Sequence, residues 1–447
     1  MGKSSAACKR PAAATKTVVK KAPVQPTITK AAFDLEKFTH LMEQVLGATE
    51  VATQAPNIIW ASGFDGMNTV GRCIDSLFGS DGNTQAFGAE MSESSAAFAL
   101  MCTNPGHVFK DRFWKITVTD VAMTAKQGGF CLKHGRKCQC VVRGSGGTAA
   151  LQLYTAGFTC KSNSVRSLKR WVQNPLEESS SSSQAFHLAV NAIRRHAPDF
   201  VVLENVLGAR RPSKPKDGGP SEAPIDRYRG ILANVPGPYQ WEDLDVTGRP
   251  LPEKRDRLII LGVKQSGGHS SFTATKWKEQ ILLLEKASDA LPIHSMVGMI
   301  ESSRPRESSS TKPTRNAQSW TDESKYHQYF SEILGKAVSA KKIHDPKPAP
   351  VAERASRRFQ LQTATAWQQA NADCCEILLK QQAEAGGWTL ESEELHPLFD
   401  LSQTCGHGHA TLFPICSTLA TSTRIFSLRT GQFLSGEAHL KTFGIIE

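Results

Sequence analysis

Cys160 lies in the stretch GFTCKS at positions 157–162, soon after the apolar run Leu151 to Tyr154. A cysteine that follows a strand faces the crevice in which open parallel sheets bind their ligands, and its thiolate is a nucleophile. The neighbouring Lys161 favours the thiolate. The pattern therefore nominates Cys160 as a nucleophile, against the alternative of a buried cysteine that only packs.

Two more groups of polar residues lie where strands are expected to end or begin. Glu204 and Asn205 follow the apolar run 200–203, and a carboxyl group there can protonate a ring nitrogen if burial raises its pKa. Arg255 and Arg257 precede another apolar run. Alternate residues of a strand share a face, so we expect both guanidinium groups on one side, where they fix phosphate or orient a base.

A glycine-containing turn and three acidic residues indicate a nucleotide-like ligand. The apolar strand Asn57 to Ala61 runs directly into Ser62, Gly63, Phe64, Asp65 and Gly66. Glycines in such a turn let the backbone approach a ligand closely. Glu90, followed by Met91, and Asp111 occupy the ends of the next two expected strands. A carboxylate in either place can bind ribose hydroxyls, although each acid alone is more typical of a helix cap or a surface charge.

Short apolar runs that alternate with helical patterns must position these residues. The runs are Ile58–Ala61, Ala96–Met101, Leu151–Tyr154, Phe200–Leu203 and Leu258–Val263, with a helix near Phe186–His196. Such alternation predicts an α/β fold with a mostly parallel sheet and helices on both faces. The serine-rich stretches Ser179–Ser183 and Ser213–Ser221 are interpreted as mobile loops.

Four segments are expected along the chain. Residues 1–32 form a basic disordered arm, because they carry few large apolar groups. Residues 33–264, which open with a helix over Phe33–Gly47, form the main domain. Residues 265–410 form a smaller, irregular domain with Ser, Lys and Pro clusters and a helical pattern near Cys374–Ala385, where Cys374 and Cys375 are expected to pack. Residues 411–447 return to the main domain.

The order of these motifs resembles the cytosine carbon-5 DNA methyltransferase family. A glycine turn, two acids, a Gly-Phe-x-Cys loop, a strand ending in Glu-Asn-Val and an Arg-x-Arg before a strand correspond to that family's FAGxG, PCQ, ENV and QxRxR motifs. The residues Pro414–Thr423 and Ser435–Gly444 are similar to the stretch that closes its target recognition domain. The resemblance covers roughly 55–265 and 400–445, and implies a Rossmann-like S-adenosylmethionine-dependent methyltransferase fold with a target recognition domain.

The resemblance also implies a role for each residue. Cys160 would add to carbon 6 of a cytosine flipped out of DNA, with Glu204 contacting ring nitrogen 3 and Arg255 or Arg257 supporting the base. Gly63, Phe64 and Asp65 would line the methionine part of S-adenosylmethionine, Glu90 would hold its ribose, and Asp111 would meet its adenine. Ser62 and Met91 would be further cofactor-binding residues. Asn205 belongs to the same Glu-Asn-Val motif. The segment after Cys160 would be the family's closing loop.

Four positions depart from the family pattern. Thr159 replaces its proline, Lys161 and Glu253 its glutamines, and Ala61 an aromatic residue. The sequence also ends at Glu447, before the family's usual Gly-Asn segment, and we expect the helix at 33–47 to fill that place. Two alternatives stay open: a nucleic-acid-binding homologue without turnover, and a methyltransferase that acts on transfer RNA.

A cysteine-rich insertion is not typical of the family. Cys131, His134, Cys138 and Cys140 fall within ten residues, a spacing that can bind zinc. The cluster is cramped for a structural zinc site, because such sites usually divide their ligands between two separated pairs. The other interpretation is a basic loop close to nucleic acid, and a metal-dependent module remains a third alternative function.

The composition favours a nucleic-acid partner. Lys and Arg outnumber Asp and Glu by 53 to 42, which gives a net charge of +11 and suits a polyanion such as DNA. The 11 cysteines, without an apolar leader, indicate a reducing compartment and free thiols. No apolar run approaches the ~18 residues of a membrane span. The stretch KRPAAATKTVVKK resembles a bipartite nuclear import signal, so we expect a nuclear protein, and a monomer.

Overall fold

A computed structural model describes a defined part of the chain. The described residues are 28–29, 58–64, 66, 68–78, 83–90, 92–109, 129–138, 152–164, 180–212, 222–247, 253–265, 272–289, 293–294, 366–390, 392, 395–403, 405, 410–412, 416–417 and 423–434. The expected arm up to residue 27, the helix at 33–47 and the loop at 213–221 lie outside them, as do residues 165–179 of the expected closing loop. The Ser, Lys and Pro clusters at 302–314 and 345–350 lie outside them as well.

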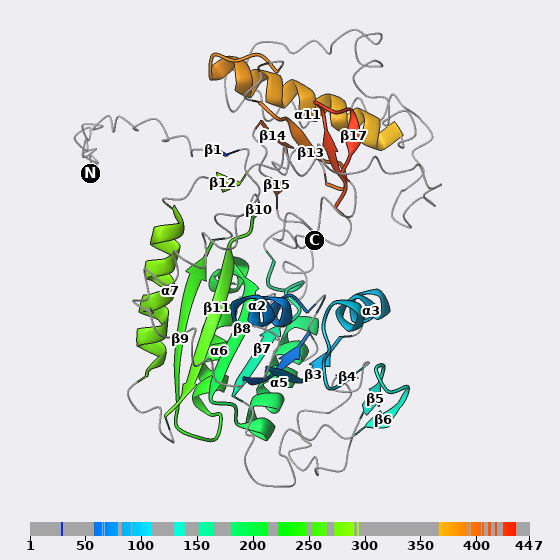
Figure 1. The fold of residues 1–447 in the computed structure, drawn as a ribbon. Coiled ribbons are helices and arrows are strands. Elements are labelled where there is room, and N and C mark those ends of the chain that lie inside the picture. Colours follow the sequence, from blue (N-terminus) through cyan, green and yellow to red (C-terminus); the bar gives the residue numbers. More distant parts are fainter. Residues whose placement is uncertain are drawn as a thin grey trace, which may run out of the picture.

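A nine-stranded sheet forms the main body of the protein (Figure 1). Its strands are β2 Ile59–Gly63, β3 Thr84–Ala89, β4 Val108–Phe109, β5 Gly129–Cys131, β6 Arg136–Cys138, β7 Leu153–Gly157, β8 Phe200–Val206, β9 Tyr239–Val246 and β11 Arg257–Lys264. Their order is β6-β5-β4-β3-β2-β7-β8-β11-β9. The central strands β4, β3, β2, β7 and β8 are parallel, while β11 runs antiparallel to β8 and β9. The predicted mostly parallel sheet is confirmed.

Helices cover both faces of this sheet, as alternating side chains of β2 illustrate. Trp60 faces α2 (Thr69–Phe78), where a Cβ on Gly71 would lie 2.9 Å from the indole ring. The next residue, Ala61, belongs to the core on the other face, which α5 (Ser181–His196) and α6 (Pro224–Ala233) complete. Parallel strands buried on both faces and helices on either side make this a Rossmann-like α/β fold.

Two expected elements differ from the structure because side-chain capping starts helices there. The apolar run Ala96–Met101 is not a strand but part of α3 (Glu93–Cys102), whose N-cap Ser92 accepts a hydrogen bond from the Ser95 amide. The serine stretch after position 179 is not a mobile loop. Ser180 caps α5 by accepting from the Ser183 amide, and Ser180 and Ser182 are buried.

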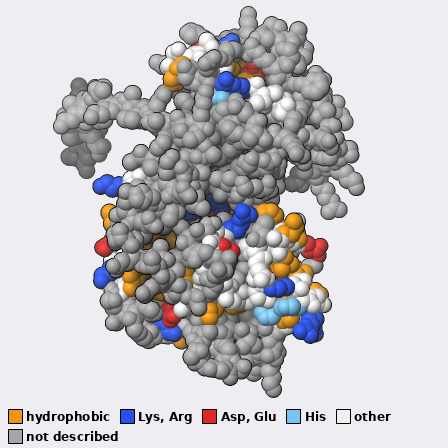
Figure 2. Space-filling model, in the orientation of Figure 1, with side chains coloured by type: hydrophobic (Ala, Val, Ile, Leu, Met, Phe, Trp, Pro, Cys, Tyr) orange, Lys and Arg blue, Asp and Glu red, His pale blue; other side chains and the backbone are white. Residues whose placement is uncertain are grey.

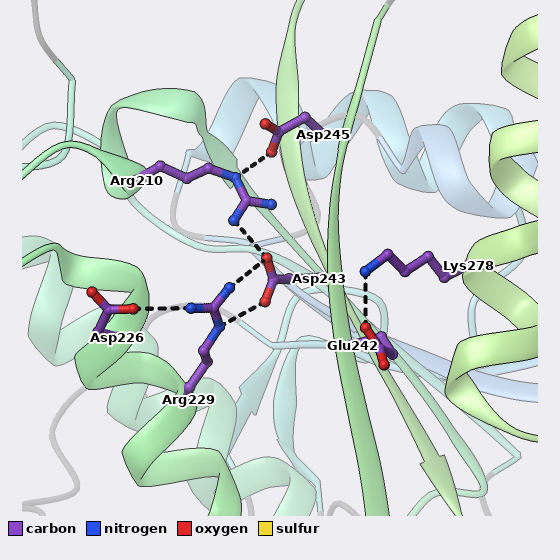
Figure 3. Close-up of polar contacts among 7 residues, drawn as sticks. All are labelled: Arg210, Asp226, Arg229, Glu242, Asp243, Asp245 and Lys278. Carbon is purple, nitrogen blue, oxygen red and sulfur yellow. Dashed lines mark hydrogen bonds and ion pairs between the residues drawn. The ribbon is translucent and has the colours of Figure 1, made fainter.

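An ion-pair network holds the end of β8 against the edge strand β9 (Figure 3). Arg210, in the 3-10 helix η3 (Leu207–Arg210) that follows β8, pairs with Asp243 at 2.6 Å and with Asp245 at 2.5 Å. Arg229 of α6 binds the same Asp243 at 2.8 Å. Arg210 therefore fixes the chain that leaves β8, the strand that carries Glu204 and Asn205, and Arg229 ties α6 to the same aspartate.

A smaller unit lies beyond the carboxyl ends of the parallel strands (Figure 1). It consists of α11 Ala366–Ala385 packed on four strands in the order β14-β13-β16-β17, namely β14 Ala410–Thr411, β13 Leu398–Asp400, β16 Ile425–Ser427 and β17 Gln432–Phe433. Cys374 and Cys375 are buried in its core, as predicted, together with Phe399 and Phe426. This core is separate from that of the large sheet.

The two units do not divide where the chain was expected to divide. Helix α7 (Ala274–Asp289) packs against β9 and β11, so the main body continues past residue 264. Strands β14, β16 and β17 pair within the smaller unit instead of returning to the main domain. Among the described strands of this segment, β15 (Cys416–Ser417) alone pairs back, with β10 (Glu253–Lys254), just before the arginine pair. Strand β1 (Ile28–Thr29) pairs with β12 (Ile293–His294).

Two composition-based expectations can be examined in the described residues. Seven cysteines among the described residues are free, namely Cys73, Cys131, Cys138, Cys160, Cys374, Cys375 and Cys405, in agreement with the expectation of free thiols. Among the described residues, no helix is both long and apolar enough to cross a membrane.

Candidate active site

The loop that carries Cys160 is folded back on itself directly after β7. The Cys160 carbonyl oxygen accepts hydrogen bonds from the amides of Asn163 and Ser164, both at 2.9 Å. The Ser162 amide donates to the hydroxyl of Ser182 in the first turn of α5 at 3.1 Å. Helix α5, whose serine-rich start was predicted to be a mobile loop, therefore anchors the loop that carries Cys160.

Asn205 ties this loop to the end of β8. Its buried side-chain amide donates to the Phe158 carbonyl at 3.1 Å, and its Oδ1 accepts from Asn163 Nδ2 at 3.0 Å. Asn163, also fully buried, donates to the Tyr228 hydroxyl of α6 at 2.9 Å. The backbone on both sides of Cys160 is thus fixed, and Asn205 acts as a positioning residue. Sequence reasoning missed Asn163, because an asparagine three residues after the cysteine carries no motif.

Glu204 lies beside the two predicted arginines. Arg257 Nε forms a close ion pair with its Oε1, and Arg255 Nη2 lies 3.9 Å from the same oxygen. The antiparallel pairing of β11 with β8 sets Ile259 opposite Glu204, which brings the start of β11 to the carboxylate. The Glu204 side chain is 32% exposed. Its carboxylate is held by charge and remains open to a ligand.

Gly157, the last residue of β7, sits opposite Glu204 in register. A Cβ at this glycine would lie 3.3 Å from Glu204 Oε2 and 4.0 Å from the Phe64 carbonyl oxygen. The glycine therefore leaves room where the turn after β2 meets the carboxylate on β8. The loops that follow β2 and β7 and the end of β8 converge on one edge of the sheet, as parallel topology requires.

Burial raises the pKa of the Cys160 thiol, and the nearby Glu204 carboxylate raises it further. Arg257, the backbone amide of Cys160 and Arg255 act in the opposite direction. The charges that favour the Cys160 thiolate thus come from Arg257, the first residue of β11, and from Arg255 just before it. The adjacent Lys161 is exposed and is not among the causes of the shift. The nucleophile needs a proton acceptor or a high pH to ionise, because the raising effects outweigh the lowering ones.

The turn after β2 is closed by Glu90. Phe64 and Gly66 both have a φ of 58°, a left-handed conformation that favours glycine. The Gly66 amide donates to Glu90 Oε2 at 2.8 Å, and the Ser92 amide donates to Oε1 at 2.6 Å. Each oxygen of an ionised carboxylate offers about two acceptor sites, so Glu90 keeps capacity for further donors such as hydroxyl groups.

The Ser62 side chain is hydrogen-bonded to β3. Its buried hydroxyl accepts from Gln85 Nε2 at 3.0 Å, and Gln85 in turn accepts from Asn68 at 2.7 Å. Gly63 and Phe64 instead line a small apolar pocket with side chains of β3, β7 and α5. The cavity holds about 20 Å³, roughly one water molecule, so a nucleotide-sized ligand would lie above the turn.

The remaining predicted site residues divide into two sets. Asp65, Met91 and Asp111 lie outside the described residues, as does Cys140 of the cysteine-rich insertion. Cys131, His134 and Cys138 come together in the β5–β6 hairpin, and their fourth neighbour is His107, which the motif search missed. His107 stands 24 positions before Cys131 in the sequence, so spacing alone carried no signal for it.

Comparisons with known proteins find distant structural likeness. No family model matches the chain, and no curated protein matches it. Solved structures similar to it include the Schizosaccharomyces pombe Dnmt2 methyltransferase, with 13% identity, 55% of this chain and 60% of that chain covered, and a TM-score of 0.33. The Entamoeba histolytica methyltransferase EhMeth is 10% identical over 46% of this chain and 52% of its own, with a TM-score of 0.27.

A third similar structure is shorter. It is a SAM-dependent methyltransferase from Aquifex aeolicus, 12% identical, which matches over 52% of this chain and 99% of its own, with a TM-score of 0.25. The chain spans about half to 60% of the length of the Dnmt2 and EhMeth structures. At this level of likeness the fold assignment rests on the strand order and direction of the sheet itself.

Proposed function

We propose that this protein is an S-adenosylmethionine-dependent methyltransferase that methylates carbon 5 of cytosine in DNA. The observation that carries the proposal is the convergence of Cys160, Glu204 and the Arg255–Arg257 pair at one carboxyl edge of the sheet. A soft nucleophile, a carboxylate and paired guanidinium groups are the set that addition to a pyrimidine ring requires.

The protein's own residues account for activation of the base. The Cys160 sulfur adds to carbon 6 of the cytosine, and the electron density moves toward ring nitrogen 3. Glu204, which Arg257 holds in place, would contact that nitrogen and supply a proton to it. Carbon 5 thereby becomes nucleophilic. After methylation, water takes the carbon-5 proton, the electrons of that bond restore the carbon 5–carbon 6 double bond, and the carbon–sulfur bond breaks to release Cys160. A base within a duplex is out of reach, so the reaction requires base flipping.

The turn after β2 and Glu90 fit the cofactor. S-adenosylmethionine, when bound, supplies the methyl group. Gly63 and Phe64 would lie along its methionine part, and the spare acceptor capacity of Glu90 suits ribose hydroxyls. Gly157 is exposed and lies between the Phe64 carbonyl of this turn and the Glu204 carboxylate. The methyl group of the cofactor and carbon 5 of the cytosine would therefore meet above this glycine.

A trapping experiment tests the proposal. The full chain is incubated with labelled cofactor and DNA in which 5-fluorocytosine replaces cytosine, because fluorine at carbon 5 cannot leave as a proton and the cysteine stays attached. We expect a protein–DNA adduct that resists denaturant, lost in Cys160→Ser and retained in Cys73→Ser, another free cysteine of the same body. On unmodified DNA, the first variant should also lose methyl transfer.

The same assay separates the alternatives. Equal methyl transfer by the unaltered protein and Cys160→Ser would refute the proposed mechanism. DNA binding without adduct or transfer in either protein would identify a nucleic-acid-binding homologue. Transfer to transfer RNA but not to DNA would keep the chemistry and change the substrate.

A further inference from the structure

Four metal-binding side chains meet at the corner of the sheet formed by β4, β5 and β6. They are His107, Cys131, His134 and Cys138, and their ligand atoms all lie within 4.8 Å of one another. His134 Nδ1 is 3.4 Å from the sulfur of Cys131 and 3.4 Å from that of Cys138. Figure 2 shows histidine side chains (pale blue) beside Lys and Arg (blue) in this part of the surface.

The two distances from His134 to the cysteine sulfurs match those between the ligands of a tetrahedral zinc ion, and the remaining ligand atoms, within 4.8 Å, would move closer by up to about 1 Å on binding. Zinc bonds of about 2.3 Å to sulfur and 2.0–2.1 Å to nitrogen place neighbouring ligand atoms roughly 3.3–3.8 Å apart. Two thiolates and two neutral imidazoles also balance the charge of a divalent cation. The cluster contains no carboxylate among the described residues, and sulfur with imidazole nitrogen favours zinc over magnesium or calcium.

The backbone around the cluster is fixed by hydrogen bonds outside the four side chains. The Leu132 amide donates to the Val108 carbonyl at 2.8 Å, which joins the β5–β6 turn to β4. Lys133 Nζ donates to the Pro105 carbonyl at 2.6 Å, and the Gly88 amide donates to the His107 carbonyl at 2.8 Å. The strand pairing therefore presents the four donors to one point before any ion binds.

We propose that His107, Cys131, His134 and Cys138 bind one structural zinc ion. Four protein ligands leave no open position for a substrate, which distinguishes a structural from a catalytic zinc. The site lies three strands from β7, about 14 Å across the sheet, so it is independent of Cys160. Cys131 is fully buried and the Nδ1 of His107 is buried without a hydrogen-bond partner among the described residues, as suits groups whose partner is an ion.

Metal analysis of the full chain tests this site. Protein expressed with added zinc and purified without chelator should contain about one zinc per chain. His107→Ala and Cys131→Ser should each lower zinc affinity by more than about 100-fold, beyond the effect of losing a residue that only supports a ligand. Cys140→Ser is the matched control, because its spacing suggested it as a ligand, whereas the four proposed ligands already fill a tetrahedral zinc site. This variant should keep its zinc.

A variant that keeps four ligands guards against loss of folding. Cys138→His should still bind metal, and after substitution with cobalt it should show about half the thiolate-to-cobalt absorption of the unaltered protein, because one sulfur of two is gone. Absence of zinc and of any tetrahedral cobalt spectrum in the unaltered protein would overturn the proposal. Loss of zinc in Cys140→Ser with retention in His107→Ala would overturn the ligand set.

Discussion

The carboxyl edge around Cys160 and the β4–β6 corner both gather reactive side chains, but they are held together differently. At the carboxyl edge, protein groups satisfy one another: Glu204 pairs with Arg257, and Asn205 binds the Phe158 carbonyl. At the corner, the described ligand atoms converge on one place, with His134 Nδ1 at 3.4 Å from both cysteine sulfurs. Opposite charges that neutralise one another at the edge can be released to a substrate, whereas lone pairs that converge on one point are suited to permanent ligation of a cation.

The largest effect that would separate the two regions comes from Glu204→Gln. The amide keeps the shape but cannot transfer a proton to ring nitrogen 3, which gains electron density when the cysteine adds, so methyl transfer should fall about 10²–10⁴-fold. Zinc content should be unchanged, because β8 lies far from the corner. Transfer is measured with labelled cofactor and zinc by elemental analysis. Unchanged transfer would remove Glu204 from the mechanism.

Asn205→Leu tests the anchoring of the nucleophile loop. The change leaves the buried Phe158 carbonyl without its donor and Asn163 Nδ2 without one acceptor, and each unmet group costs about 1–3 kcal/mol. We expect the free energy of unfolding to fall by about 2–4 kcal/mol in urea titrations. A loss below about 1 kcal/mol would mean that Asn205 does not hold the loop.

His196, the last residue of α5, makes the stability of the main body sensitive to acid. Burial, with a smaller effect from Arg195, lowers its pKa from 6.5 to about 4, and its ring packs on Phe87 of β3. Because the folded pKa lies below the unfolded value, the contribution is complete above pH 6.5 and is lost as pH falls toward 4, by up to about 3 kcal/mol.

His196→Phe should therefore reduce the dependence of stability on pH within this window. The buried Nε2 has no hydrogen-bond partner in the described part of the chain, so an apolar ring fits its place. Unfolding midpoints measured at pH 7 and pH 4.5 provide the test. An equally steep loss of stability in the variant would assign the acid sensitivity to other groups.

The smallest effect concerns the ionisation of Cys160. Arg257→Ala removes a charge that lowers the pKa of the thiol, so the pH midpoint of Cys160 alkylation should move upward. Lys161→Ala is the matched control and should leave the midpoint in place. The rates are followed by mass spectrometry of the labelled cysteine peptide. A larger upward shift of the alkylation midpoint in Lys161→Ala would support the sequence-based prediction that Lys161 favours the thiolate.

Local patterns predicted the strand ends and their residues well. Apolar runs identified β2, β7, β8 and β11, and polar residues directly after or before them converge on one edge because parallel strands all end there. Local patterns failed where a side chain caps a helix. Ser92 starts α3, so the apolar run 96–101 was wrongly predicted to be a strand, and Ser180 starts α5, so the serine run 179–183 was wrongly predicted to be a mobile loop. Strand β9 was missed because charged residues alternate along it and pair with Arg210 and Arg229.

By itself, the sequence determined the α/β class, the nomination of Cys160 and Glu204, and a cysteine cluster capable of binding metal. Only the tertiary structure decided which charges act on Cys160, what anchors its loop, and which residue joins the cluster. The physical reason is the separation along the chain over which each interaction acts. Periodicity and capping act over a few residues, whereas Arg257, Asn163 and His107 reach their partners through strand pairing and buried hydrogen bonds between segments far apart in the chain.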